Sequence, residues 1–260
     1  MRTFIELVKQ IFRTEIEDYS FPIFSSLHFK ILFFIGITIF FIIIFRKQLK
    51  NFKYKRILEV LVAIFLISTQ VFLFIWYLRF PNFYLKESLP LYPCRIAIIM
   101  ASIALLWKKN EFSRAITYFF GTIGGSLALL IPLTNPYFFP HITYYTFFVG
   151  HYFLLVTSLY IILVEGFVIK KKHVKQAIVF SFFFALCAFI ANYILDANYA
   201  FLNPENGYEF LSRMNIESNI LTTSIATYLG FVFLIFIMYL PFKIREYREK
   251  SLFEDPIIKY

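Results

Sequence analysis

The chain has 260 residues, of which 60% are hydrophobic, 22% aromatic and 16% charged. A soluble domain carries about 25% charged residues, so this composition excludes an ordinary soluble protein and predicts an all-α polytopic membrane protein. The net charge of +10 does not point to nucleic-acid binding, because the basic residues lie in the connections between apolar runs, which is typical of membrane topology.

Residues 1–27 precede the first apolar run and lack the pattern of a cleavable signal peptide. We expect them to be an extracytoplasmic segment, followed by a transmembrane domain over 28–241 and a cytoplasmic basic tail over 242–260. Runs of about 17–25 apolar residues can cross a membrane as helices, and this chain has seven of them. The seven predicted helices are residues 28–45, 57–78, 90–107, 115–133, 142–166, 175–197 and 218–241.

The fourth run is interrupted by Gly121, Gly124 and Gly125 and is followed by Pro132. Small residues at this spacing predict that two helices approach each other closely. Alternate connections carry 18 and 6 Lys and Arg residues, and the remaining two lie inside predicted helices. The side rich in positive charge is cytoplasmic, so we expect the N-terminus outside and the C-terminus inside.

Cys94 is the candidate nucleophile, because Arg95 follows it directly and a cation beside a thiol favours the thiolate. At 1.5 Å per helical residue, Cys94 lies about one turn and His151 about two to three turns below the outer surface. A nucleophilic cysteine needs a base and a group that orients the base. We assign the base to His151 and the orienting group to Asp196 or Asn192.

Polar residues gather in the outer half of the predicted bundle, where Asn198 and Tyr199 also lie. This pattern suggests a wet cavity that is open to the outside or to the outer leaflet. Arg95 could bind a phosphate or stabilise developing negative charge. A structural alternative pairs Arg95 with Asp196, or leaves both at the headgroups. An amphiphilic substrate fits such a cavity, and we expect acyl transfer to or from a lipid, with a thioester on Cys94 between the two half-reactions.

No metal motif and no cofactor are expected, and a disulfide between Cys94 and Cys187 is not expected either. His28 and His141 are predicted at the level of the headgroups and His173 on the solvated surface. The expected partners are membrane lipids, not nucleic acid, and the oligomeric state stays open.

Three stretches resemble the YwaF-like family of bacterial integral membrane proteins: the block from Leu89 to Ala97, the helix with His151, and Asn192 to Leu202. The resemblance spans roughly residues 20–245. This family is related to a vertebrate transmembrane acyltransferase implicated in placing polyunsaturated chains on ether phospholipids. The resemblance implies that Cys94 and His151 are the catalytic pair, and that the chain is a multi-pass protein of the cell membrane, in bacteria the cytoplasmic membrane.

Other functions remain open from the sequence. A lipid thioesterase would use the same residues as an acyltransferase. A transporter or permease for a small polar solute would use the polar outer vestibule and Asp196, but the apolar inner halves and the lack of a detectable internal repeat weigh against it. A seven-helix sensory or scaffold protein is the third alternative.

Overall fold

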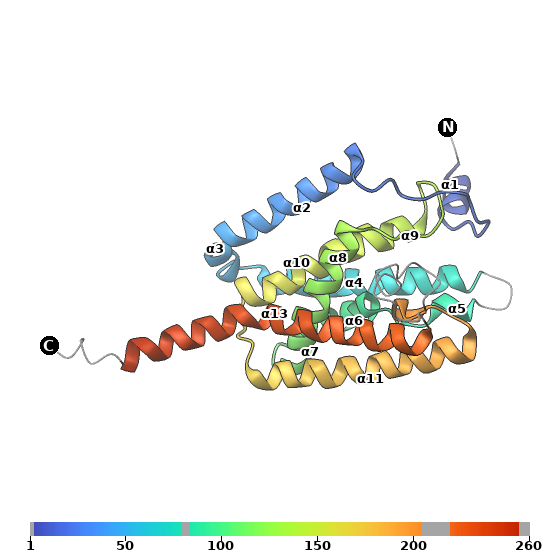
Figure 1. The fold of residues 1–260 in the computed structure, drawn as a ribbon. Coiled ribbons are helices and arrows are strands. Elements are labelled where there is room, and N and C mark those ends of the chain that lie inside the picture. The colour runs from blue at the N-terminus through green and yellow to red at the C-terminus, as the bar shows by residue number, and fades with distance from the viewer. Residues whose placement is uncertain (1–2, 80–83, 204–218, 255–260) are drawn as a thin grey trace.

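The computed structural model describes residues 3–79, 84–203 and 219–254, and within them the chain forms helices and no strands. The long helices lie along one another as a bundle, with residues 4–11 at one end and the C-terminal part of the last helix at the other (Figure 1). Among the described residues, five helical runs are long and apolar enough to cross a membrane. They are α2 (Ser26–Ile44), α4 (Lys55–Tyr77), the run from Ile142 to Leu163, α11 (Lys171–Leu195) and α13 (Ile220–Glu254). The protein is therefore a multi-pass membrane protein.

Two of the helical runs contain a π-helical turn. One is formed by α7, η1 and α8 in succession, and the other by α9, η2 and α10. The remaining elements are short helices and α6, an apolar helix of 14 residues. The bounds of these elements are α1 (Phe4–Ile11), α3 (Arg46–Lys50), α5 (Leu85–Ser88), α6 (Pro93–Leu106), α7 (Glu111–Ile116), η1 (Thr117–Gly121), α8 (Thr122–Leu130), α9 (Ile142–Tyr144), η2 (Tyr145–Val149), α10 (Gly150–Leu163) and η3 (Tyr199–Phe201).

A helical run lies at each of the seven predicted ranges, and most of the ends differ by a few residues. Only five of these runs are candidate membrane spans in the described part of the chain. The other two are α6, which is a shorter apolar helix, and the run of α7, η1 and α8. The last helix continues past Pro241 to Glu254, so the predicted basic tail begins inside it. Residue 218, the predicted start of that helix, and residues 255–260 of the tail lie outside the described residues.

Helix α6 packs against α4, η1 and α10 in the main core. Ala97 and Ala101 of α6 are fully buried in this core. Ser102 strengthens this contact because its hydroxyl donates to the Ala63 carbonyl oxygen of α4, at 3.2 Å. The neighbours of Cys94 on α6 are therefore fixed by close helix packing.

Two of the three glycines in the fourth run lie where another helix comes close. A Cβ on Gly121 would lie 2.2 Å from the Ser158 hydroxyl oxygen of α10, and a Cβ on Gly125 would lie 3.2 Å from the Leu155 Cβ. A Cβ on Gly124 would meet no atom within 4 Å. The predicted close packing is thus confirmed at Gly121 and Gly125, and it holds α10 against η1 and α8.

The ends of the helices near Cys94 follow from local sequence. Pro93 is the first residue of α6, where proline is favoured because the N–H that it lacks would have no helical partner. Asp196 ends α11 in the left-handed conformation, with φ 49°, which Asp and Asn tolerate better than most residues. Cys94 therefore occupies the first turn of α6, at the end of the helix that favours negative charge.

Candidate functional site

Cys94 and His151 contact each other. The Cys94 thiol and the His151 imidazole interact electrostatically and lie within reach of a hydrogen bond. Cys94 is a free, half-buried thiol that packs against the main core, while His151 is 6% exposed. The structure thus brings the thiol of α6 to the imidazole of α10, although the two residues are 57 positions apart in the sequence.

The Phe147 carbonyl oxygen holds the imidazole in one orientation. His151 Nδ1 lies 2.6 Å from this oxygen. A carbonyl oxygen can only accept a hydrogen bond, so Nδ1 carries the proton and Nε2 is left for the thiol of Cys94. Phe147 lies inside the π-helical turn η2, and its oxygen also accepts from the Gly150 N–H. π-helical turns are frequent at functional sites, and this one supplies the group that orients the candidate base.

Asn192 and Asp196, which we expected to orient His151, have other partners. The buried Asn192 amide donates to the Tyr199 carbonyl oxygen at 2.9 Å and accepts from the Tyr199 N–H at 2.6 Å. The Asp196 carboxylate is 86% exposed and pairs with the Lys86 ammonium at 2.7 Å, which holds the pKa of Asp196 below its usual value. The expectation is corrected, because the orienting group is the carbonyl of η2.

Arg95 is buried, and its guanidinium bonds to groups of this chain. Nη1 donates to the main-chain oxygens of Glu87, Ser88 and Leu89 at 2.9, 3.1 and 2.9 Å. Nε donates to the Gln70 side-chain oxygen at 3.3 Å, and the guanidinium lies over the Tyr77 ring. Arg95 is thus not paired with Asp196, and its described contacts anchor the segment before Cys94.

Tyr199 and Asn198 fix the loop that follows α11. The buried Tyr199 hydroxyl donates to the Leu85 carbonyl oxygen and accepts from the Leu89 N–H, the latter at 3.0 Å. The Asn198 side-chain oxygen accepts from the Asn203 N–H at 2.9 Å. Together with Arg95, Tyr199 therefore holds both ends of the segment 85–89, which leads directly into α6 and Cys94.

Three groups near the site were not found from the sequence: Gln70, Glu87 and the carbonyl oxygen of Phe147. The Glu87 carboxylate accepts from the Tyr77 hydroxyl and the Asn135 amide, each at 3.4 Å, and burial raises its pKa. Glu87 could have been found from the sequence, because it is an acidic residue shortly before the block that contains Cys94. Phe147 contacts His151 through its main-chain oxygen and also through its ring, whose centroid lies 4.6 Å from that of the imidazole.

Of the remaining histidines, His173 is more buried than predicted. His28, His141 and His173 are each fully buried. His173, expected on the surface, packs its ring against Phe167 and lies 3.2 Å from a Glu111 carboxylate oxygen. Cys94 and Cys187 are both free thiols. The described residues contain no group of three or more His, Cys, Asp or Glu that could hold a metal ion.

Comparison with known families gives one result that covers most of the chain. The sequence model described as the TMEM164 family matches residues 23–240, a range that includes Cys94, His151 and the loop that holds Tyr199. No curated protein and no solved structure matches the chain. Since the match covers well over half of the sequence, the chain is an integral membrane protein that belongs to the TMEM164 family.

Proposed function

We propose that this protein is a lipid acyltransferase of the cell membrane, which holds the acyl chain as a thioester on Cys94 and acts on a phospholipid or a related amphiphile from the outer leaflet. The contact between the Cys94 thiol and the His151 imidazole carries the proposal. The resemblance of the Cys94 and His151 segments to YwaF-like bacterial proteins supports it as well.

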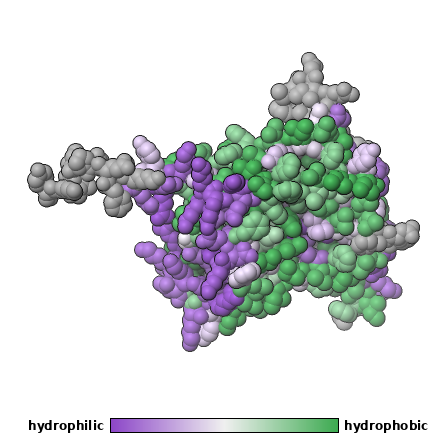
Figure 2. All heavy atoms as spheres, turned by 90° about the horizontal axis from the view of Figure 1, so that it is seen from below, coloured by the Kyte–Doolittle hydropathy of each residue, from purple (hydrophilic) through white to green (hydrophobic). Residues whose placement is uncertain are grey.

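The proposed topology has seven membrane-crossing helices, with the N-terminus outside and the C-terminus in the cytoplasm. The alternation of basic connections supports this orientation. Hydrophilic side chains gather at the end of the molecule where α13 leaves the bundle, and most of the remaining surface in that view is apolar (Figure 2). Cys94 lies at the start of α6, about 18 Å along the helix from Leu106, so it is near the outer surface in this topology.

The chemistry proceeds in two half-reactions. His151 Nε2 takes the thiol proton, and the sulfur of Cys94 attacks the ester carbonyl of a donor lipid. The ester C–O bond breaks, the proton passes from His151 to the departing alkoxide, and a lysolipid leaves. In the second half-reaction His151 takes the proton of an acceptor hydroxyl, which attacks the thioester. The C–S bond breaks, and the sulfur regains the proton.

The Nδ1–H bond to Phe147 suits this cycle because it fixes the tautomer in which Nε2 is free to accept a proton. It also places a main-chain dipole beside the imidazolium that forms in each half-reaction. The buried contacts of Arg95 and Tyr199 keep the segment before Cys94 in one conformation. A fixed nucleophile and base lower the barrier by positioning.

The transporter alternative rested on the polar outer vestibule and on Asp196 as an intramembrane acid. The Asp196 carboxylate is exposed and paired with Lys86, so this residue does not favour that function. The lipid thioesterase differs from the acyltransferase only in the acceptor, which would be water in place of a lipid hydroxyl.

The test is covalent labelling in membranes with an acyl probe that carries a reactive ester, followed by cleavage with neutral hydroxylamine. Wild type and Cys187→Ala should label, because Cys187 is the other free thiol and lies outside the site. Cys94→Ala and His151→Ala should lose hydroxylamine-sensitive label. Equal labelling of Cys94→Ala and wild type would refute the mechanism, and so would full lipid-transfer activity of Cys94→Ser.

A further inference from the structure

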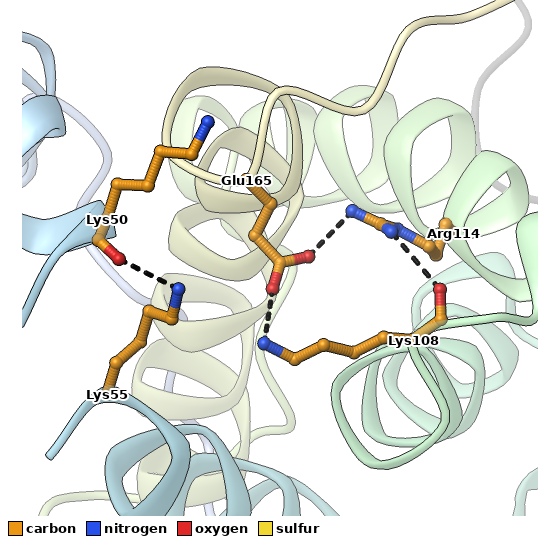
Figure 3. A pocket seen from close by; sticks show the side chains of 5 residues that line it. All are labelled: Lys50, Lys55, Lys108, Arg114 and Glu165. Atoms are coloured by element: carbon orange, nitrogen blue, oxygen red, sulfur yellow. Dashed lines mark hydrogen bonds and ion pairs between the residues drawn. The ribbon is translucent and has the colours of Figure 1, made fainter. Parts of the chain in front are cut away.

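A basic pocket of about 180 Å³ lies at the other end of α6 from Cys94. Lys50 and Lys55, before and at the start of α4, line one side, Lys108 and Arg114 line the other, and Glu165 stands between them (Figure 3). Pockets that enclose drug-sized ligands measure about 300–1,000 Å³. This pocket therefore suits one small polar group rather than a whole cofactor.

The only carboxylate that lines the pocket is already neutralised by two cations. Glu165 contacts Lys108 through Oε1 at 2.8 Å and Arg114 through Oε2 at 2.7 Å. Lys108 also contacts the buried carboxylate of Glu59, at 2.6 Å. Arg56 contacts Glu59 as well, at 3.5 Å, so three cations match the two carboxylates on this side and both oxygens of Glu165 are paired.

The lysines on the opposite side add positive charge that no carboxylate balances. Lys55 Nζ donates to the main-chain oxygen of Lys50 at 2.8 Å, and neither lysine forms a salt bridge within the described residues. Arg114 also lines the pocket, and its Nη2 is paired with Glu165. Two unbalanced ammonium groups around a small pocket provide the charge and the donors that bind a phosphate group.

Aromatic residues next to these lysines place the pocket at the membrane surface. Trp107, which directly precedes Lys108, is 61% exposed, and Tyr54, which precedes Lys55, is 51% exposed. Exposed Trp and Tyr are typical of the boundary between the hydrocarbon core and the headgroups. The pocket is also about 20 Å along the chain direction of α6 from Cys94, so it is separate from the candidate active site.

We propose that this pocket binds the phosphate of an anionic phospholipid, with the headgroup between Lys50, Lys55 and Arg114 and the acyl chains in the bilayer beside α6. A free phosphate ion has the same chemistry and would use the same donors. The lipid is the favoured source, because the neighbouring aromatics set the pocket at headgroup depth and basic clusters at this level attract anionic lipids. The inference does not depend on acyl transfer at Cys94.

The test uses the full-length protein in phosphatidylcholine nanodiscs with and without phosphatidylglycerol, and native mass spectrometry counts the phosphatidylglycerol that remains bound. The pocket variant is Lys50→Gln/Lys55→Gln. The matched control is Lys47→Gln/Lys53→Gln, which removes the same charge from the same connection outside the pocket. We expect the pocket variant to bind phosphatidylglycerol roughly tenfold more weakly than the control.

Further arms distinguish the source of the phosphate and guard against misfolding. Lys50→Gln alone changes an exposed side chain and should weaken binding in a protein whose unfolding temperature is unchanged. Inorganic phosphate should not displace the bound lipid. Equal loss in the pocket variant and the control, or no preference of the wild type for phosphatidylglycerol, would overturn the inference. Displacement by inorganic phosphate at equal concentration would overturn the lipid assignment.

Discussion

Replacement of Gly121 by alanine should destabilise the protein by about 1–3 kcal/mol. The new Cβ would lie 2.2 Å from the Ser158 hydroxyl oxygen and 3.0 Å from the Leu154 Cδ1, and overpacking of this kind costs about 1–3 kcal/mol. Ser158 cannot move aside freely, since its one hydroxyl proton is shared between the carbonyl oxygens of Thr117 and Leu154, at 2.9 and 2.8 Å. Losing these bonds adds about 1 kcal/mol, which offsets the gain of about 1 kcal/mol when alanine replaces a helical glycine.

The matched control is Gly124→Ala, because a Cβ at that position meets no atom within 4 Å. It keeps the helical gain without the clash, so stability should be unchanged or up to about 1 kcal/mol higher. The double variant Gly121→Ala/Ser158→Ala removes the nearest obstructing atom and should recover part of the loss. Thermal unfolding in detergent is the assay, with about 2–4 °C expected per kcal/mol for a chain of this size.

Equal unfolding temperatures for Gly121→Ala and Gly124→Ala would refute the reasoning. So would a double variant that is no more stable than Gly121→Ala alone. Either result would mean that the close approach of η1 to α10 does not fix the helix that carries the candidate base.

Gly125→Ala places a Cβ 3.2 Å from the Leu155 Cβ and should shift α10 by a few tenths of an ångström. Acyl-probe labelling should fall roughly tenfold, since displacements of about 1 Å can cost 10²-fold in rate; unchanged labelling would contradict this. Tyr199→Phe removes the partner of two main-chain groups and should cost about 1–3 kcal/mol in thermal unfolding, whereas wild-type stability would show that water replaces the hydroxyl. Arg95→Lys should lower both stability and labelling because an ammonium cannot reach all four of its partners. Asp196→Asn should leave both unchanged because its carboxylate is exposed, and loss of labelling in this variant would move Asp196 into the reacting centre.

Much of the fold could be predicted from hydropathy alone. The apolar runs are long and their ends carry charge, proline or glycine, so helices such as 28–45 and 57–78 were located to within a few residues of α2 and α4. Seven spans were predicted, whereas the described residues contain five candidates. One of the differences is α6, whose length depends on where Pro93 starts the helix and where the chain leaves it after Leu106.

The candidate site was predictable only at residues whose side-chain chemistry is unusual for their position in the sequence. Cys94 stood out for the cation beside it and His151 for its apolar surroundings, and counting residues put them about one to two helical turns apart in depth. The partners of Arg95 could not be predicted, because they are carbonyl oxygens of a loop whose path no sequence pattern specifies. Asn192 was noticed for its polarity, but its role depends on the return of the chain to Tyr199 seven residues later.

The carbonyl oxygen that holds His151 is an atom that every amino acid possesses. A substitution at Phe147 would remove the ring that packs on the imidazole, but it would leave the main-chain oxygen that accepts from Nδ1 in place. What must be preserved is the number of residues in the wide turn of η2. Deleting one residue there would rotate the helix on one side by about 100° relative to the other and turn the imidazole away from the thiol. The contact between His151 and Cys94 therefore depends on the length of this segment more than on its amino-acid composition.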